Sequence, residues 1–273
     1  MDARSRAKAV SADAKRAAAL FASVLALAGC ATRAGGAGSS LAGPSGGLPS
    51  GGLPSGRLPA GAVLVDSGKP GPLLLVVAGM HGDEPSGPLA ARILASFGAD
   101  AALPGQSWAI GRGALLVLPE ANPEACSAGL RESPPKTGLP AEDLNRRFPG
   151  HRRGGEGPAR AAEIFAAALG ADLSIDLHES GWAWTEADSP SLVLSPAAAP
   201  FALELLEALD GKGAPFAFTG GAPYGSLVWA LGAKGRAAIG VEAPARLSEA
   251  ERIALHLAVV RESATLLGMT DRP

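Results

Sequence analysis

From about Ala62 onward, hydrophobic residues follow two kinds of spacing. Continuous apolar runs alternate with segments in which apolar residues recur every three or four positions. The continuous runs are typical of strands buried on both faces, because a strand with one solvent-exposed face would alternate apolar and polar residues. These predicted strands cover residues 72–78, 114–119, 172–177 and 237–241.

The helical spacing predicts three helices, at residues 88–97, 158–169 and 248–267. Ser248 and Glu251 form a capping-box pattern at the start of the last helix. Gly98 ends the first predicted helix and Gly268 ends the last one. The expected apolar faces include Leu89, Ile93 and Phe97 in the first helix and Ala161, Ile164, Phe165, Ala168 and Leu169 in the second. Alternating strands and helices predict an α/β domain with a mostly parallel central sheet flanked by helices.

The N-terminal part of the chain has a different pattern. Basic residues up to Arg16 precede an apolar run at 17–28 that is too short to span a membrane as a typical helix. The run ends in Leu-Ala-Gly-Cys30, which resembles the lipobox of bacterial lipoproteins, where cleavage precedes an acylated Cys. We therefore expect a signal peptide at 1–29, a Gly/Pro/Ser-rich tether at 30–60 and a folded domain at 61–273.

This leader predicts an exported bacterial lipoprotein. Its only attachment to the membrane would be the N-terminal lipid on Cys30, and it would face the periplasm or the cell exterior. An ordinary signal peptide with a chance Cys is the alternative. The net charge is only −2 and no Lys/Arg-rich stripe follows the leader, so we expect no nucleic-acid partner.

Candidate metal ligands stand where two predicted strands end. His81 and Glu84 follow the first strand in a glycine-containing turn, and His178 ends the strand at 172–177. Ligands gather at the carboxyl ends of parallel strands. Two His and one carboxylate would form an open three-ligand site with a fourth position for water, the arrangement of many catalytic zinc sites. A His-x-x-Glu pattern alone is weak, because it also occurs in ordinary surface turns.

Further segments strengthen this interpretation. They are Asn-Pro-Glu-Ala at 122–125, Arg131, Asp-Leu-Asn-Arg-Arg-Phe-Pro-Gly at 143–150, and Glu242 at the end of the last predicted strand. In this order, over roughly 62–268, the sequence resembles the zinc carboxypeptidase superfamily. Within it, the chain is most similar to the succinylglutamate desuccinylase/aspartoacylase branch. The resemblance implies a single zinc-carboxypeptidase-like catalytic domain.

The resemblance also implies roles for the matching residues. His81, Glu84 and His178 would bind one zinc ion per chain, and Asp143 would orient a zinc-bound His. In the remaining roles, Glu242 would be the general base, Arg131 would stabilise the oxyanion, and Asn145 and Arg146 would hold a substrate carboxylate.

Two enzymatic functions fit a carboxylate anchor beside a hydrolytic site. The first is an N-acyl amino acid deacylase, and the second is an exported metallocarboxypeptidase acting on peptides or cell-wall peptides. A non-catalytic binding lipoprotein is a third possibility, but no expected ligand or base is missing. Only about thirty residues follow Glu242, whereas desuccinylases and aspartoacylases usually carry a further C-terminal domain, so we expect a more open site.

Several other residues receive no role from the sequence. His256 is expected to be a surface or half-buried residue of the last helix, and Cys126 a small buried one. Glu179 is expected to point away from His178, since side chains alternate along a strand. The sequence leaves open whether Tyr224, Trp182 and Trp184 line the pocket or only pack.

Overall fold

A computed structural model describes residues 58–96, 109–136, 140–180, 189–214 and 216–270. Within these residues a seven-stranded sheet has the order β1-β3-β2-β4-β7-β5-β6. The strands are β1 (Val63–Asp66), β2 (Leu73–Ala78), β3 (Ala114–Leu118), β4 (Leu173–Ser180), β5 (Ser191–Leu194), β6 (Ala217–Gly221) and β7 (Ala238–Pro244). The β3-β2-β4-β7 centre and the β5–β6 pair are parallel, whereas β1 and β5 run antiparallel to β3 and β7. The expected α/β architecture is confirmed.

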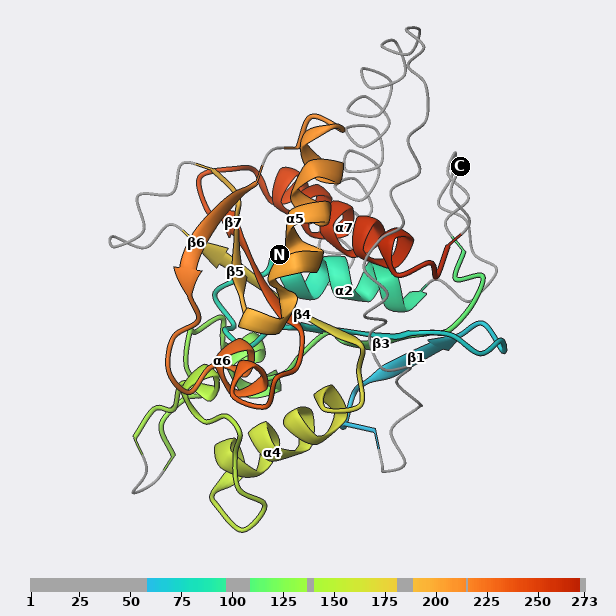
Figure 1. The fold of residues 1–273 in the computed structure, drawn as a ribbon. Coiled ribbons are helices and arrows are strands. Elements are labelled where there is room, and N and C mark those ends of the chain that lie inside the picture. The colour runs from blue at the N-terminus through green and yellow to red at the C-terminus, as the bar shows by residue number, and fades with distance from the viewer. Residues whose placement is uncertain (1–57, 97–108, 137–139, 181–188, 215, 271–273) are drawn as a thin grey trace, which may run out of the picture.

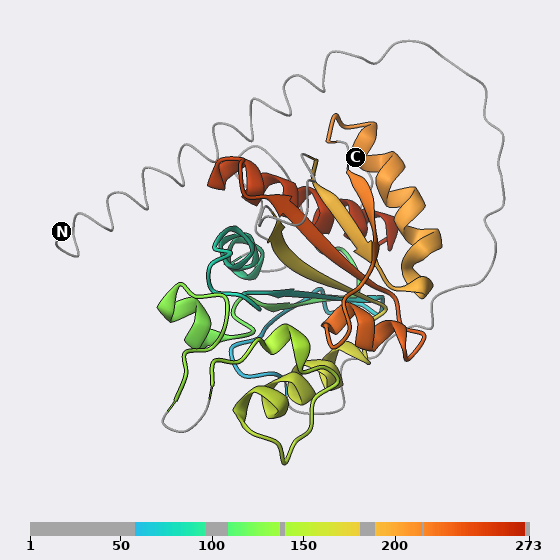
Figure 2. The same ribbon diagram turned by 90° about the vertical axis from the view of Figure 1, so that its left-hand side faces the viewer.

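Helices cover both faces of the sheet (Figures 1 and 2). One layer contains α2 (Ser86–Ser96), α5 (Ala199–Asp210) and α7 (Glu249–Leu266), and the opposite layer contains α4 (Glu156–Ala168) and α6 (Leu227–Gly232). The short elements are α3 (Pro123–Ala128), η1 (Leu144–Arg146) and η2 (Pro196–Ala198). No helix among the described residues has the length and apolarity to cross a membrane.

Strand β2 shows why its sequence is continuously apolar. Leu74 and Val76 belong to the core on the α2/α7 side, whereas Leu73, Leu75 and Val77 belong to the core on the α4/α6 side. All six residues of the strand are buried. The central strands therefore need apolar residues at both parities.

The helices agree with the sequence in position but differ in detail. Helix α2 begins at Ser86, before Pro88, and its most buried residues include Ala90, Ala91 and Leu94, whereas Leu89 and Ile93 are only partly buried. The expected face therefore packs against the core at its edge, through Leu89 and Ile93, and Phe97 and Gly98 lie outside the described residues. Leu169 is 39% exposed beyond the end of α4, which corrects its assignment to the buried stripe. Helix α7 has the capping box of Ser248 and Glu251 that its sequence predicts.

The described chain begins at Leu58, and these first residues pack against the domain. Leu58 contacts the core on the α4/α6 side, and Pro59 is buried. The backbone N–H of Ala60 donates to Glu163 Oε1 at 3.1 Å. The expected signal peptide, with Cys30, and most of the tether lie outside the described residues.

Candidate metal centre

Two glycines allow the turn after β2 to pass close to α3. Gly79 has φ 67°, and a Cβ at this position would lie 2.8 Å from Cys126 Sγ. A Cβ on Gly82 would lie 1.9 Å from the carbonyl oxygen of Ala125, so no larger residue fits there. The Gly82 N–H donates to the Leu130 carbonyl at 2.8 Å, which fixes the turn. His81 and Glu84 are thereby held above the end of β2.

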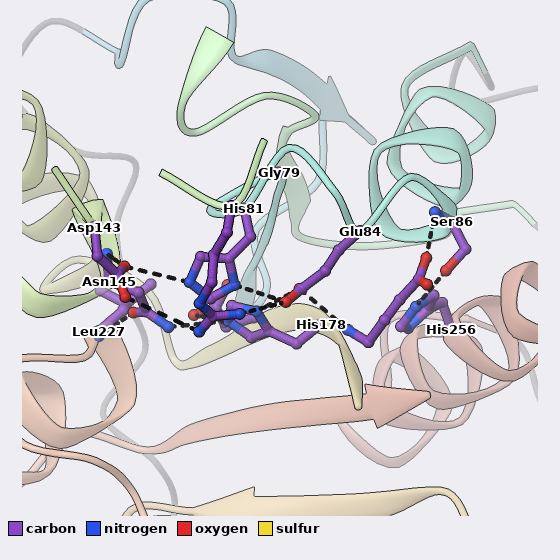
Figure 3. A network of polar contacts seen from close by, with 12 residues as sticks. Gly79, His81, Glu84, Ser86, Asp143, Asn145, His178, Leu227 and His256 are labelled. Atoms are coloured by element: carbon purple, nitrogen blue, oxygen red, sulfur yellow. Dashed lines mark hydrogen bonds and ion pairs between the residues drawn. The ribbon is translucent and has the colours of Figure 1, made fainter. Parts of the chain in front are cut away.

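Strands β4 and β7 supply the other two residues of the candidate site, His178 and Glu242. β4 lies between β2 and β7 in the sheet, and His178 on β4 is in register with Glu242 on β7. The parallel strands thus end at the same edge, where the turn after β2 also lies. Residues separated by almost one hundred positions in sequence meet here (Figure 3).

Glu84 lies between the two histidines. Its Oε1 is 2.7 Å from His81 Nδ1, and its Oε2 is 2.9 Å from His178 Nδ1. All three side chains are buried, and one potential ligand atom from each lies within 4.8 Å of the others. Two imidazoles and one carboxylate form a donor set suited to zinc. The cluster fits a metal ion, and the structure brings together the three ligands expected from the sequence.

Each imidazole has an acidic partner at its other nitrogen. Asp143 Oδ1 lies 3.3 Å from His81 Nε2, the position expected of a residue that orients this ring. Asp176 Oδ2 lies 3.0 Å from His178 Nε2, a partner that the sequence interpretation missed. The Asp-x-His spacing could have predicted this contact, because residues two apart on a strand point to the same face of the sheet. In metal sites, acidic partners of this kind orient the imidazole rings that bind the ion.

The pKa values in the cluster reflect this packing. Burial alone would lower the pKa of His178, but Asp176 and Glu84 outweigh it and raise the pKa well above its usual value. Burial alone would raise the pKa of Glu84, but His178 and His81 hold it well below the usual range. The Glu84 carboxylate is therefore negatively charged and lies between two basic imidazole rings. A divalent cation could take the place of these rings as the charge partner of Glu84.

Glu242 has a different environment, although it lies beside His178 in the sheet. Burial raises its pKa above the value of an ordinary glutamate. A general base works best when its pKa is near the operating pH, so the shift favours that role. The structure thus places the expected base next to the ligand cluster without making it part of that cluster.

The three residues expected to contact substrate lie around Asp143. Arg131 Nη1 donates to Glu84 Oε1 at 3.3 Å, so this guanidinium reaches the cluster directly. Arg146 Nη1 donates to the carbonyl of Asn145 at 2.8 Å, and its side chain remains partly exposed. The Asn145 side chain is buried, with Oδ1 accepting from the Leu227 N–H and Nδ2 lying 3.2 Å from His178 Nε2.

Other residues considered in the sequence are also placed. The expectation of a surface or half-buried His256 was wrong: it is fully buried, and its Nε2 lies 3.2 Å from Ser86 Oγ. Burial lowers its pKa to about 3, so the ring is neutral. Cys126 is half-buried rather than fully buried. Tyr224 is 78% exposed and packs on Trp229, whereas Trp182 and Trp184 lie outside the described residues.

Known proteins share this fold and sequence pattern. The chain is 32% identical over 170 residues to an N-alpha-acetyl-L-2,4-diaminobutyric acid deacetylase from Halomonas elongata, covering 60% of this chain and 42% of that protein. Its fold is similar to that of an aspartoacylase family protein from Mesorhizobium loti, with 27% identity, a TM-score of 0.56 and 74% and 60% of the two chains covered. It is also similar to a succinylglutamate desuccinylase from a Silicibacter species, with 22% identity, a TM-score of 0.60 and 78% and 61% covered.

The chain thus spans less than half the length of this deacetylase and about three fifths of the two solved structures. A profile of the succinylglutamate desuccinylase/aspartoacylase catalytic domain matches residues 70–262, which include the complete candidate site. The protein belongs to the succinylglutamate desuccinylase/aspartoacylase family.

Proposed function

We propose that this chain is a zinc-dependent hydrolase that cleaves an amide bond next to a free carboxylate, as in an N-acyl amino acid. The observation that carries the proposal is the buried cluster of His81, Glu84 and His178, with Glu242 beside it and Arg146 partly exposed nearby. The similarity to a deacetylase of an N-acetylated amino acid supports the deacylase over other hydrolases.

The residues divide the chemical work. When bound to His81, Glu84 and His178, zinc would lower the pKa of a water ligand towards ~7 and so favour its deprotonation at neutral pH. Glu242 takes the proton from the attacking water and returns it to the leaving amine. Arg131 stabilises the negative oxygen that develops on the former carbonyl group.

The substrate is positioned by its carboxylate. The guanidinium of Arg146 can form two parallel charge-assisted hydrogen bonds with this group. The buried Asn145 positions Arg146, because its backbone carbonyl accepts a hydrogen bond from the Arg146 guanidinium. The Asn145 side chain is itself fixed, since its Oδ1 accepts from the Leu227 N–H. A free carboxylate beside the amide is also present at a peptide C-terminus, so the same anchor would serve a metallocarboxypeptidase.

A panel of substrates distinguishes these two activities. The protein should release the acyl group from N-acetylated or N-succinylated amino acids faster than it releases the C-terminal residue from short peptides, as measured by chromatographic separation of products. Faster release of C-terminal residues would instead assign the site to a carboxypeptidase. No hydrolysis of either class, with zinc bound, would contradict the enzymatic proposal.

The variant Arg146→Ala tests the anchor within this assay. We expect KM for substrates with a free carboxylate to rise by about 10- to 100-fold, the loss expected for charge-assisted hydrogen bonds, with little change for amidated analogues. Arg147→Ala is the matched control, because the adjacent Arg147 pairs with Glu142 at 2.6 Å. Equal effects of Arg146→Ala on free and amidated substrates would show that this residue does not bind the carboxylate.

We also propose that the protein is exported and anchored to a membrane through a lipid on Cys30. The basic and apolar leader that ends in Leu-Ala-Gly-Cys supports this proposal. Cys30→Ala should abolish lipid attachment and thereby change both the mass of the protein and its membrane fractionation. Unchanged mass and unchanged fractionation of the variant would argue against lipidation.

A further inference from the structure

Glu179 follows the ligand His178 on β4 but faces the opposite side of the sheet, as the sequence predicts. Its carboxylate points toward the α2/α7 layer, where Oε1 accepts the Ser86 N–H at 2.8 Å. Ser86 is the first residue of α2 and lies two positions after the ligand Glu84. The Glu179 side chain therefore holds the end of the turn that carries Glu84.

The backbone of Glu179 contacts the ligand itself. Its N–H donates to Glu84 Oε2 at 3.1 Å, and this is the oxygen that lies 2.9 Å from His178 Nδ1. One residue thus fixes Glu84 from two directions, through its side chain at the following helix and through its backbone at the carboxylate. These contacts connect Glu84 to the strand that carries His178.

A buried arginine fixes Glu179 in turn. Arg252 of α7 places Nε 3.0 Å from Glu179 Oε2, and both side chains are largely buried. The Nη1 of Arg252 donates to the carbonyls of Ala245, at 2.9 Å, and Leu247. Both carbonyls belong to the loop that leaves β7 shortly after Glu242. The ion pair consequently connects the Glu84 turn, the His178 strand and the exit of the Glu242 strand.

The neighbouring histidine gives this arrangement a second support. His256, also on α7, is fully buried, with its Nε2 3.2 Å from Ser86 Oγ (Figure 3). Helix α7 therefore contacts Ser86 directly as well as through Arg252 and Glu179. Ser86 is itself fully buried and its hydroxyl is not accessible to a substrate. These residues therefore support the site from behind and do not form a second catalytic centre.

We propose that Glu179, held by Arg252, is a positioning residue that fixes Glu84 and His178 in the geometry required for zinc binding. This inference rests on the proposed zinc site and adds to it a specific support in the α2/α7 layer. Metal sites depend on residues that orient their ligands, and loss of such a residue typically weakens metal affinity or activity by ~10- to 100-fold. Glu179→Ala removes the acceptor for the Ser86 N–H and leaves the Arg252 charge buried without its partner.

The test compares zinc affinity of full-length variants by competition with a chromophoric chelator. Glu163 offers a matched control, because its carboxylate also accepts a backbone N–H, that of Ala60, and pairs with an arginine, Arg160, at 2.7 Å. We expect Glu179→Ala to weaken zinc binding at least ~10-fold. Glu179→Gln, which keeps an acceptor for Ser86, should have a smaller effect. Glu163→Ala should bind zinc as the parent protein does.

Kinetics at saturating zinc provide a second readout. Because Arg146 belongs to η1 and not to the Glu179 network, we expect Glu179→Gln to lower kcat with little change in KM. Circular dichroism identifies variants that fail to fold, and Arg252→Met then tests the same pair from its other side. Parent-like zinc affinity in folded Glu179→Ala or Arg252→Met would overturn the inference, as would an equal loss in Glu163→Ala. Failure of the parent protein to bind zinc would instead contradict the proposed function.

Discussion

Replacing Glu242 with glutamine is expected to leave zinc bound while lowering kcat by at least ~10²-fold, the usual scale for loss of a general base. The amide keeps the size of the side chain but has no basic carboxylate to accept a proton. His81, Glu84 and His178 form the ligand cluster without Glu242, so metal content should not change. The measurement combines steady-state kinetics on the best substrate with metal analysis of the same sample.

A suitable control is Glu249→Gln, which makes the same chemical change at an exposed position in the first turn of α7. It should retain parental kcat and zinc. Near-normal kcat in Glu242→Gln would show that another group accepts the proton. Loss of zinc from Glu242→Gln would mean that Glu242 is a ligand.

Removing either histidine should abolish stoichiometric zinc binding. His81→Ala and His178→Ala each remove one of three protein donors from a buried site, and they also leave Asp143 or Asp176 without its imidazole partner. We expect about one zinc per chain in the parent protein and close to none in these variants after dialysis. Inductively coupled plasma mass spectrometry of folded protein provides the measurement.

His151→Ala controls for the loss of an imidazole, because His151 is exposed in the loop before α4. This variant should retain zinc. Full zinc retention in both His81→Ala and His178→Ala would refute the assignment of the metal centre.

The central strands and the clustering of His81, Glu84 and His178 could be predicted from sequence. A strand such as β2, covered on both faces, requires an unbroken apolar run. No local spacing shows that His81 and His178 meet, since their contact depends on β2 and β4 being neighbours in the sheet. Their association was predicted from their places at the ends of two predicted strands, and the ordered family pattern strengthened that prediction.

The sequence patterns of β6, α5 and His256 are weaker than those of the central strands. The edge strand β6 is short and contains glycine and threonine, so its sequence does not form an apolar run. Helix α5 was overlooked although Ala202, Leu205 and Leu209 have helical spacing and are buried. His256 lies three residues after Ile253 on the buried stripe of α7, and this spacing indicates burial despite its polarity.

The contacts of Glu179 could not be predicted from the sequence and are known only from the structure. Alternation along β4 predicts which face of the sheet each side chain occupies, but not which residue it contacts on that face. Arg252 lies more than seventy positions away in sequence and meets Glu179 only because α7 packs across α2 and β4. Support for a site from a different layer of the fold leaves no local pattern in the chain.

The most direct test of the proposed function is the zinc dependence of amide hydrolysis in the parent protein. Release of acetate or succinate from the preferred N-acyl amino acid should be measured before chelation, after removal of the metal, and after addition of one equivalent of zinc. We predict that hydrolysis disappears with the metal and returns with stoichiometric zinc, while Glu242→Gln binds zinc without recovering activity. Undiminished hydrolysis by metal-free protein would contradict the proposed function.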